Sequence, residues 1–513
     1  MSTPAVVIAA PASGSGKTTV ATGLIGALRR AGHAVAPFKV GPDYIDPGYH
    51  GLAAARPGRN LDPVLVGTDR VVPLYRHGTR GCDIAVVEGV MGLFDGRIDD
   101  DRADAVAEGS TAQVAALLGA PVVLVVDARG HSQSLAALLH GFATFDSGIR
   151  LGGVILNRVG SERHEQVLRA ACARVGMPVL GALPRMAELS VPSRHLGLIP
   201  AVEHGGAARA AVDTMTELVA AHVDLAAIAR LAAARVHGPA WDAVAAVTGT
   251  VHDALSTAAT EGVDSAVEGG VESGRLTGAA VSSDVGADAE SRLVGSVAHG
   301  PTGGAETVIA VAGGAAFTFG YAEHRELLEA AGATVVAFDP MRDELPRDTA
   351  GLVLPGGFPE EHAAELARNG PLLSAVAESA RRGMPVHAEC AGLLYLARSL
   401  DGHRMAGVVD VAAEFGPRLT LGYRDAVALT DSPLWRAGDR VRGHEFHRTH
   451  LTAAESQPPA WGWRSPEGRT VREGAVVHRV HASYLHTHPA GNPTATARFV
   501  AAAAAYAAER SDA

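Results

Sequence analysis

A phosphate-binding loop is the first candidate for chemistry in this 513-residue sequence. The apolar run Val6–Ala10 leads into Pro11-Ala12-Ser13-Gly14-Ser15-Gly16-Lys17-Thr18-Thr19, and a helix-like segment follows. Small residues let backbone N–H groups turn toward an anion, and the N-terminus of the following helix also favours negative charge. We therefore expect the Ser13–Thr19 loop to bind ATP, with Lys17 at the β- and γ-phosphates and the Thr18 hydroxyl at Mg²⁺. Pro11 replaces the usual first glycine of GxxxxGK[ST], so a plain helix-capping turn is the alternative.

Acidic residues follow two further apolar runs. Asp83–Val87 leads into Glu88, and Ala34–Val40 leads into Asp43-Tyr44-Ile45-Asp46. Acids at these strand ends are suited to hold the metal of a phosphoryl site, so Glu88 and Asp46 are the predicted metal residues. The alternatives are a solvated strand-end glutamate and a simple Asp-x-x-Asp-Pro turn.

Residues beside these acids are candidates for substrate binding. Lys39, Asp43 and Tyr44 lie at the end of the second apolar run, where a lysine and acids suit an anionic substrate. Asp95 lies in the glycine-dense segment Gly89–Gly96, whose composition suggests close backbone approach to a ligand. We assign these four residues to the substrate as an expectation.

A second kind of chemistry is indicated by Cys390. It lies between a predicted strand and helix and has the small neighbours Ala388 and Ala391, as a sharp nucleophile elbow requires. The helix N-terminus would lower the thiol pKa. The backbone N–H groups of Gly356 and Gly357, after another apolar run, are the predicted oxyanion hole. A structural cysteine and a Pro-Gly-Gly turn are the alternatives.

A cysteine nucleophile needs a base, and two histidine clusters offer one. His486 and His488 lie in SYLHTHP near the C-terminus, and His444 and His447 lie in RGHEFH. The residues alone do not choose between the clusters, and neither spacing demands a metal.

The elements that position these residues follow an alternating pattern. Uninterrupted short apolar runs, typical of strands covered on both faces, alternate with Ala/Leu-rich helical segments. The pattern predicts an α/β protein with two doubly wound parallel-sheet domains. We place an ATP-dependent domain at 1–236, a low-complexity linker at 237–304 and a second domain, which contains the candidate nucleophile Cys390, at 305–507. Gly, Ala, Ser, Thr and acids dominate the linker, and a poorly patterned helix pair is its alternative.

Composition narrows the function classes. The net charge is −11 and no long basic run occurs, which argues against a nucleic-acid partner. Three cysteines without CxxC spacing argue against disulfides and zinc. The sequence has no signal-peptide pattern and no apolar run of about 20 residues, so we expect a cytoplasmic enzyme without a membrane partner. A homodimer is an assembly that the sequence leaves open.

Five segments together resemble the cobyrinic and hydrogenobyrinic acid a,c-diamide synthase family. They are APASGSGKTT, FKVGPDYIDP, VVEGVMGLFDG, NRVGSERH and VPSRHLGL, and their order matches that family. The first domain of the family is similar to dethiobiotin synthetase. PGGFPE, AECAGLLYL and SYLHTHP resemble the class I glutamine amidotransferases in the same way.

The resemblance implies ATP-driven amidation of two acetate side chains of a corrinoid in cobalamin biosynthesis, through an acyl phosphate and with glutamine as nitrogen donor. By position, His486 matches the base of the glutaminase, and Asn157 is a candidate contact for the nucleotide base. His488 replaces the glutamate that many relatives carry two residues after the base, which leaves the orienting partner of His486 unknown. RGHEFH is implied to be structural or substrate-lining.

Three other functions compete with this interpretation. One is amidation of a related tetrapyrrole such as nickel sirohydrochlorin. Another is an ATP-driven partitioning switch, but Ala12 replaces the signature lysine of those ATPases and Cys390 and His486 are both present. The third is a free-standing glutaminase, which the phosphate loop contradicts.

Overall fold

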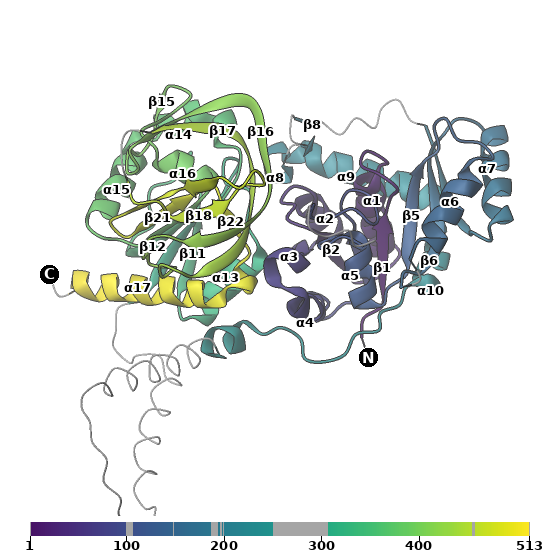
Figure 1. The fold of residues 1–513 in the computed structure, drawn as a ribbon, viewed down its shortest axis with the longest axis horizontal. Helices are drawn as coiled ribbons and strands as arrows, with labels where there is room; N and C mark the ends of the chain where they lie inside the picture. The colour runs from purple at the N-terminus through teal and green to yellow at the C-terminus, as the bar shows by residue number, and fades with distance from the viewer. Residues whose placement is uncertain are drawn as a thin grey trace, which may run out of the picture.

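A computed structural model describes residues 2–98, 106–146, 148–185, 193–194, 197–198, 200–249, 306–453 and 457–511. In this part of the chain, two α/β domains lie side by side (Figure 1). The predicted class, with a parallel sheet in each domain, is confirmed. Most of the predicted linker lies outside the described residues.

The described residues of the first domain form a seven-stranded sheet in the order β3-β2-β4-β1-β5-β6-β7. Each neighbouring pair is parallel. The strands are β1 (Ala5–Ala9), β2 (Val35–Val40), β3 (Arg59–Leu61), β4 (Ile84–Glu88), β5 (Val122–Asp127), β6 (Leu151–Val159) and β7 (Val179–Pro184). The carboxyl ends of β1, β2 and β4 are neighbours, so the residues that follow them meet at one edge of the sheet.

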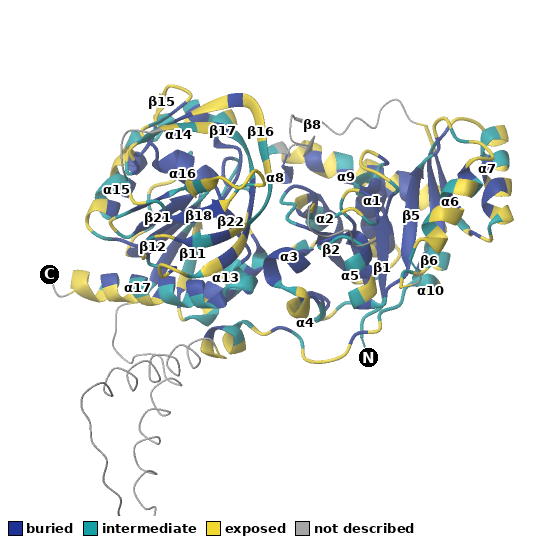
Figure 2. Ribbon diagram, in the orientation of Figure 1, coloured by how far each residue is buried: buried dark blue, intermediate teal, exposed yellow. Residues whose placement is uncertain are grey.

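Helices cover both faces of this sheet. One layer contains α1 (Lys17–Arg30), α2 (Asp46–Ala54) and α9 (Gly206–His222), and the other contains α4 (Thr68–Gly78), α5 (Thr111–Leu118), α6 (Leu135–Thr144) and α7 (Glu162–Arg174). Val6 and Ile8 of β1 pack into the first layer, and Val7 and Ala9 pack into the second. Every residue of β1 is therefore buried, which explains its uninterrupted apolar sequence (Figure 2).

The chain remains packed on the first domain beyond residue 236. Trp241 and Val247 are buried in the core that contains α4, and the Trp241 N–H donates to the Pro73 carbonyl over 2.9 Å. Residues 243–249 are helical. This segment lies inside the range that the sequence assigns to the linker, and its buried tryptophan is a large apolar residue that such a linker lacks.

The second domain contains a six-stranded sheet among its described residues, in the order β11-β10-β12-β13-β21-β20. The strands are β10 (Val308–Ala312), β11 (Thr334–Phe338), β12 (Thr349–Leu354), β13 (Val386–Glu389), β20 (Ala475–Val477) and β21 (Val480–Ser483). Only the β20–β21 pair of this sheet is antiparallel. Its helices include α13 (Ala322–Ala330), α15 (Gly370–Arg381), α16 (Ala391–Leu396) and α17 (Pro493–Ser511).

A further, mostly antiparallel sheet in the second domain was not predicted from the sequence. It is built around the long hairpin of β16 (Val411–Ala428) and β17 (Arg440–Ala453), extended by β18 (Trp461–Arg464), β19 (Thr470–Glu473) and β22 (His486–Thr487). The RGHEFH segment lies on β17, and His444 is in register with His486 of β22. The sheet thus brings the two histidine clusters together.

Polar contacts join the two domains. Arg59 donates to Glu323 over 2.6 Å, and the His77 ring lies 2.9 Å from Glu326. A second set of contacts involves the hairpin: Tyr423 donates to Asp62 over 3.0 Å and Arg442 donates to Glu108 over 2.8 Å. None of the helices in the described residues is long and apolar enough to cross a bilayer.

Candidate functional site

The phosphate loop connects β1 to α1 and is open to a ligand. Ser13 and Gly14 are exposed, whereas Lys17 is buried and its Nζ donates to the Met91 carbonyl over 2.5 Å. Gly16 has φ 95°, a conformation that glycine adopts without strain. Burial is the main reason that the pKa of Lys17 is lowered, and nearby Lys39 adds to that effect. An anionic phosphate would relieve both effects, as the predicted role of Lys17 requires.

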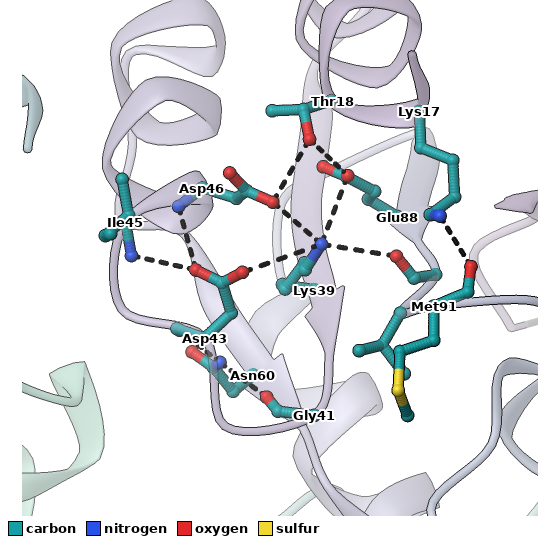
Figure 3. A network of polar contacts seen from close by, with 12 residues as sticks. Lys17, Thr18, Lys39, Gly41, Asp43, Ile45, Asp46, Asn60, Glu88 and Met91 are labelled. Carbon is teal, nitrogen blue, oxygen red and sulfur yellow. Dashed lines mark hydrogen bonds and ion pairs between the residues drawn. The ribbon is translucent and has the colours of Figure 1, made fainter. Parts of the chain in front are cut away.

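The predicted metal residues converge beside this loop (Figure 3). The Thr18 hydroxyl donates to Glu88 Oε1 over 2.8 Å and lies 3.2 Å from Asp46 Oδ2. Lys39 Nζ lies between the same carboxylates, at 2.8 Å from Asp46 and 3.1 Å from Glu88. Three separate strand ends therefore supply one cluster of oxygen atoms.

The charges in this cluster are strongly coupled. Burial raises the pKa of Asp46 to about 7, and the nearby Asp43 carboxylate acts in the same direction. Burial also opposes ionisation of Glu88, but Lys39 and His50 outweigh it and hold the pKa of Glu88 at about 2. His50 of α2 was not predicted from the sequence, although its Nε2 lies 2.7 Å from Glu88 Oε2.

The oxygen cluster fits a hard cation. Mg²⁺ prefers a few carboxylate or hydroxyl oxygens together with water and substrate phosphate, rather than a cage made by protein alone. Thr18, Asp46 and Glu88 supply such oxygens, and the described residues contain no cluster of three or more His, Cys, Asp or Glu of metal-binding geometry. A magnesium role for these three residues stays a prediction.

Asn157 lies under the phosphate loop. Its amide Nδ2 donates to the Ser15 carbonyl over 2.9 Å, and a Cβ on Gly16 would lie only 2.3 Å from that nitrogen. Contact of Asn157 with the nucleotide base stays a prediction. The adjacent Arg158, which sequence reasoning missed, donates to the Gly14 carbonyl over 2.9 Å and to Asp127 over 2.6 Å.

Three of the four predicted substrate residues occupy two loops at the same edge, whereas Lys39 lies buried near the end of β2. Asp43 caps the start of α2, since its Oδ1 accepts from the Asp46 N–H over 3.0 Å. Asp95 closes the glycine-rich loop by accepting from the Gly92 N–H over 2.9 Å. Tyr44 extends to the second domain, where its hydroxyl lies 2.9 Å from the Tyr321 hydroxyl.

Cys390 has the backbone geometry of a nucleophile elbow. It lies between β13 and α16 with φ 49° and ψ −98°, and a non-glycine residue in such a conformation is strained by about 1–3 kcal/mol. The backbone N–H groups of Ala391 and Gly357 both interact with its thiol. Burial raises the pKa of Cys390, contrary to the lowering expected from the helix N-terminus. Attack therefore needs a base to remove the thiol proton.

The oxyanion-hole prediction named Gly356 and Gly357. Gly357 directs its N–H to the cysteine, whereas Gly356 accepts from the Phe319 N–H over 3.0 Å. A Cβ on Gly356 would lie 2.4 Å from the His486 ring, so only glycine fits there. Ala391, which sequence reasoning did not assign, is the second donor beside the sulfur.

His486 is buried beside a carboxylate that directly precedes the nucleophile. Its Nδ1 lies 3.9 Å from Glu389 Oε2, and Glu389 Oε1 accepts from the Thr487 hydroxyl over 2.9 Å. Burial lowers the pKa of His486 to about 4 even though Glu389 acts to raise it. A neutral imidazole with an adjacent carboxylate is suited to accept a proton.

The other histidines have different surroundings. His488 accepts from the Ala490 N–H over 3.2 Å, and its ring packs against Tyr321 at 4.1 Å between ring centroids. His447 stacks on Tyr484 at 3.7 Å. These contacts indicate that His488 and His447 stabilise the protein around Cys390 and His486.

A cleft of about 2320 Å³ is lined by residues of both domains. Asp43, Tyr44 and Met91 line it on the ATP side, and His444, Glu445 and Phe446 line it on the other. Met91 accepts from Lys17, while the Phe446 carbonyl lies 4.0 Å from the Cys390 sulfur. The lining of the cleft therefore includes one residue that contacts Lys17 and one residue that contacts Cys390.

Comparisons with known proteins match each domain to a separate family. Residues 6–199 match a family described as the CobQ/CobB/MinD/ParA nucleotide binding domain, and residues 308–494 match the CobB/CobQ-like glutamine amidotransferase domain. The chain is 57% identical to hydrogenobyrinate a,c-diamide synthase of Mycobacterium tuberculosis, over 98% of this chain and 99% of the relative.

More distant relatives carry related names. The enzyme of the same name from Streptomyces coelicolor is 54% identical over 97% of both chains. Cobyrinate a,c-diamide synthase of Syntrophotalea carbinolica is 39% identical over 98% of both. On identity and coverage alike, the chain belongs to the family of hydrogenobyrinate and cobyrinate a,c-diamide synthases.

Proposed function

We propose that this chain converts the a and c carboxylates of hydrogenobyrinate to amides, with ATP as energy source and glutamine as nitrogen donor. The observation that carries the proposal is the interdomain cleft, which borders Met91 beside Lys17 and Phe446 beside Cys390. A bound acid in this cleft can receive phosphate from one side and ammonia from the other.

Ammonia is released in the second domain. His486 removes the proton of the Cys390 thiol, and the sulfur attacks the carboxamide carbon of glutamine. The N–H groups of Gly357 and Ala391 stabilise the oxyanion of the tetrahedral intermediate. Collapse of that intermediate forms a thioester and transfers the proton to the departing ammonia, after which water releases glutamate.

Activation takes place in the first domain. A carboxylate is a poor electrophile, so its oxygen attacks the γ-phosphorus of ATP and displaces ADP. Lys17 and the loop N–H groups hold the phosphates, and the buried Lys39 pairs with Asp46 and Glu88 beside them. Ammonia then attacks the acyl phosphate, the amide forms, and inorganic phosphate leaves.

A magnesium ion is part of the proposal. Thr18, Asp46 and Glu88 would hold it, and when bound it neutralises charge on the β- and γ-phosphates. Removal of Asp46 or Glu88 should raise the Mg²⁺ concentration needed for half-maximal rate.

The ring without cobalt is the favoured substrate, because the relatives at 48–57% identity are named for hydrogenobyrinate. The test is mass spectrometry of hydrogenobyrinate, cobyrinate and nickel sirohydrochlorin after incubation with enzyme, ATP, Mg²⁺ and glutamine. We expect hydrogenobyrinate to gain two amide groups with the highest kcat/KM. Amidation of nickel sirohydrochlorin alone would overturn the proposal.

A further inference from the structure

We infer that the glutaminase domain also binds the corrinoid, through a row of arginines on its antiparallel sheet that pairs with carboxylates of the macrocycle. This inference rests on the proposed function. It assigns to Arg440, Arg464 and Arg472 the recognition of a polycarboxylate, a task separate from ammonia release.

The pairing of the strands places these arginines on one face. Arg440 of β17 is in register with Val427 of β16, Val427 with Gly462 of β18, and Gly462 with Arg472 of β19. Directly paired residues of antiparallel strands point to the same face, and Arg464 lies two residues after Gly462 on that face. Three strand spacings put the Cα atoms of Arg440 and Arg472 about 15 Å apart.

The three guanidinium groups have no carboxylate partner among the residues that the structure describes. All three are exposed and line the interdomain cleft. In contrast, the acids that line the cleft are engaged elsewhere. Asp425 pairs with Arg97 and Arg442, Glu445 with Arg424, and Glu467 with Arg469. Glu473 accepts from Ser483 and from the Tyr484 N–H over 2.7 Å, and Asp43 lies 3.8 Å from Lys39. Unpaired positive charge is therefore left in the cleft of a chain whose net charge is −11.

Exposed apolar side chains line the same cleft. Ile98 is 92% exposed, Leu421 is 54% exposed, and Met91 and Leu429 are each 40% exposed. A hairpin face that only contacts water would account for the arginines. It would not account for these apolar side chains, because their removal from water is favourable. A ligand with an apolar ring and carboxylates around its rim complements both the apolar side chains and the arginines of the cleft.

The size and position of the cleft also fit this ligand. Its volume of about 2320 Å³ exceeds the roughly 300–1,000 Å³ typical of small-ligand pockets. Its other wall contains Asp43 and Met91 beside the ATP site. Arginines on the second domain can therefore hold the carboxylates that are not reacting while one carboxylate faces the phosphate loop.

The test compares R440Q/R472Q with the matched control R404Q. Arg404 of β15 (His403–Arg404) is also exposed, belongs to the same domain and does not line the cleft. Amidation is measured with ammonium chloride in place of glutamine, so that the glutaminase step is bypassed. Binding of hydrogenobyrinate without ATP is measured separately by quenching of tryptophan fluorescence. Circular dichroism and glutamine hydrolysis without corrinoid report on folding.

We expect R440Q/R472Q to raise the KM and the Kd for hydrogenobyrinate about tenfold or more, since each lost contact is a charge-assisted hydrogen bond. The KM for ATP and the hydrolysis of glutamine should stay within about twofold of the wild type, and R404Q should match the wild type throughout. An unchanged Kd in folded R440Q/R472Q, or an equal change in R404Q, overturns the inference. If the wild type fails to amidate hydrogenobyrinate, the proposed function fails, and the Kd comparison still tests the arginine row.

Discussion

The ring of Tyr44 lies 5.0 Å from the ring of His486, although the two residues belong to different domains. Tyr44 directly follows Asp43 in the loop after β2, and it also stacks on Phe319 at 4.9 Å between ring centroids. A residue of the loop after β2 thus forms part of the surroundings of the proposed glutaminase base. The loop beside the proposed ATP site therefore contacts the proposed glutaminase site, and this contact offers a way for one site to affect the other.

Replacement of Tyr44 by alanine should uncouple the half-reactions. The change removes the packing against His486, so we expect more glutamate to be released per amide formed than in the wild type. The measurement is the ratio of glutamate to amide at saturating ATP and corrinoid. Tyr321→Phe is the control, because it removes only the hydrogen bond to the Tyr44 hydroxyl. A wild-type ratio in Tyr44→Ala would show that the contact has no part in coupling.

Glu389 is the residue that we expect to orient His486. Glu389→Gln should slow glutamine hydrolysis about tenfold or more, less than the 10²–10⁴-fold typical of losing a general base. Amidation with ammonium should remain near the wild-type rate. His488→Gln should have a milder effect on hydrolysis than Glu389→Gln, since His488 caps the turn at Ala490. If Glu389→Gln hydrolyses glutamine normally, another group orients the base.

The pH dependence of glutamine hydrolysis should reflect the buried imidazole. Burial lowers the pKa of His486 to about 4, so the base is neutral above about pH 5. The rate should therefore fall only as the pH drops toward 4, rather than near 6.5 as for an ordinary histidine. Glu389 raises the pKa of His486, so Glu389→Gln should shift this decline to lower pH. An acidic limb near pH 6.5 in a folded enzyme would contradict the assignment.

Lys17→Ala should abolish amidation with glutamine and with ammonium alike. Both nitrogen sources require the acyl phosphate, and we propose that Lys17 acts in the phosphoryl transfer that forms it. The measurement is ADP formation together with amide formation. Arg158→Gln is the comparison variant, because Arg158 contacts the phosphate loop only through the Gly14 carbonyl. We expect this variant to lower the amidation rate less than Lys17→Ala does. Ammonium-dependent turnover near normal in Lys17→Ala would remove Lys17 from this role.

The sequence predicted the first domain well because its signals are local. Uninterrupted apolar runs predicted β1, β2 and β4 to within a few residues, and the acids that follow β2 and end β4 meet in one cluster. The strands β3 and β7 were missed. β3 contains only Arg59, Asn60 and Leu61, so it offers too short an apolar run to detect.

Contacts between residues that are far apart in the sequence leave no local pattern from which they could be predicted. Tyr423 and Asp62 are separated by 361 positions, and nothing local to either residue indicates their hydrogen bond. His50 resembles any other residue of its helix until folding buries it against Glu88. The antiparallel sheet was missed because its long strands leave residues such as Leu421 exposed, which breaks the simple apolar alternation.

We propose two separable sites joined by transferred ammonia, and the Cys390→Ala variant separates them. The measurement is the amidation rate of this variant with glutamine and with a high concentration of ammonium chloride, alongside the wild type. We predict loss of glutaminase activity and glutamine-dependent amidation, with ATP-dependent amidation from ammonium retained near the wild-type rate. Retained use of glutamine would exclude Cys390 as the nucleophile, and equal loss with both nitrogen sources in a folded protein would contradict a mechanism with two separable sites.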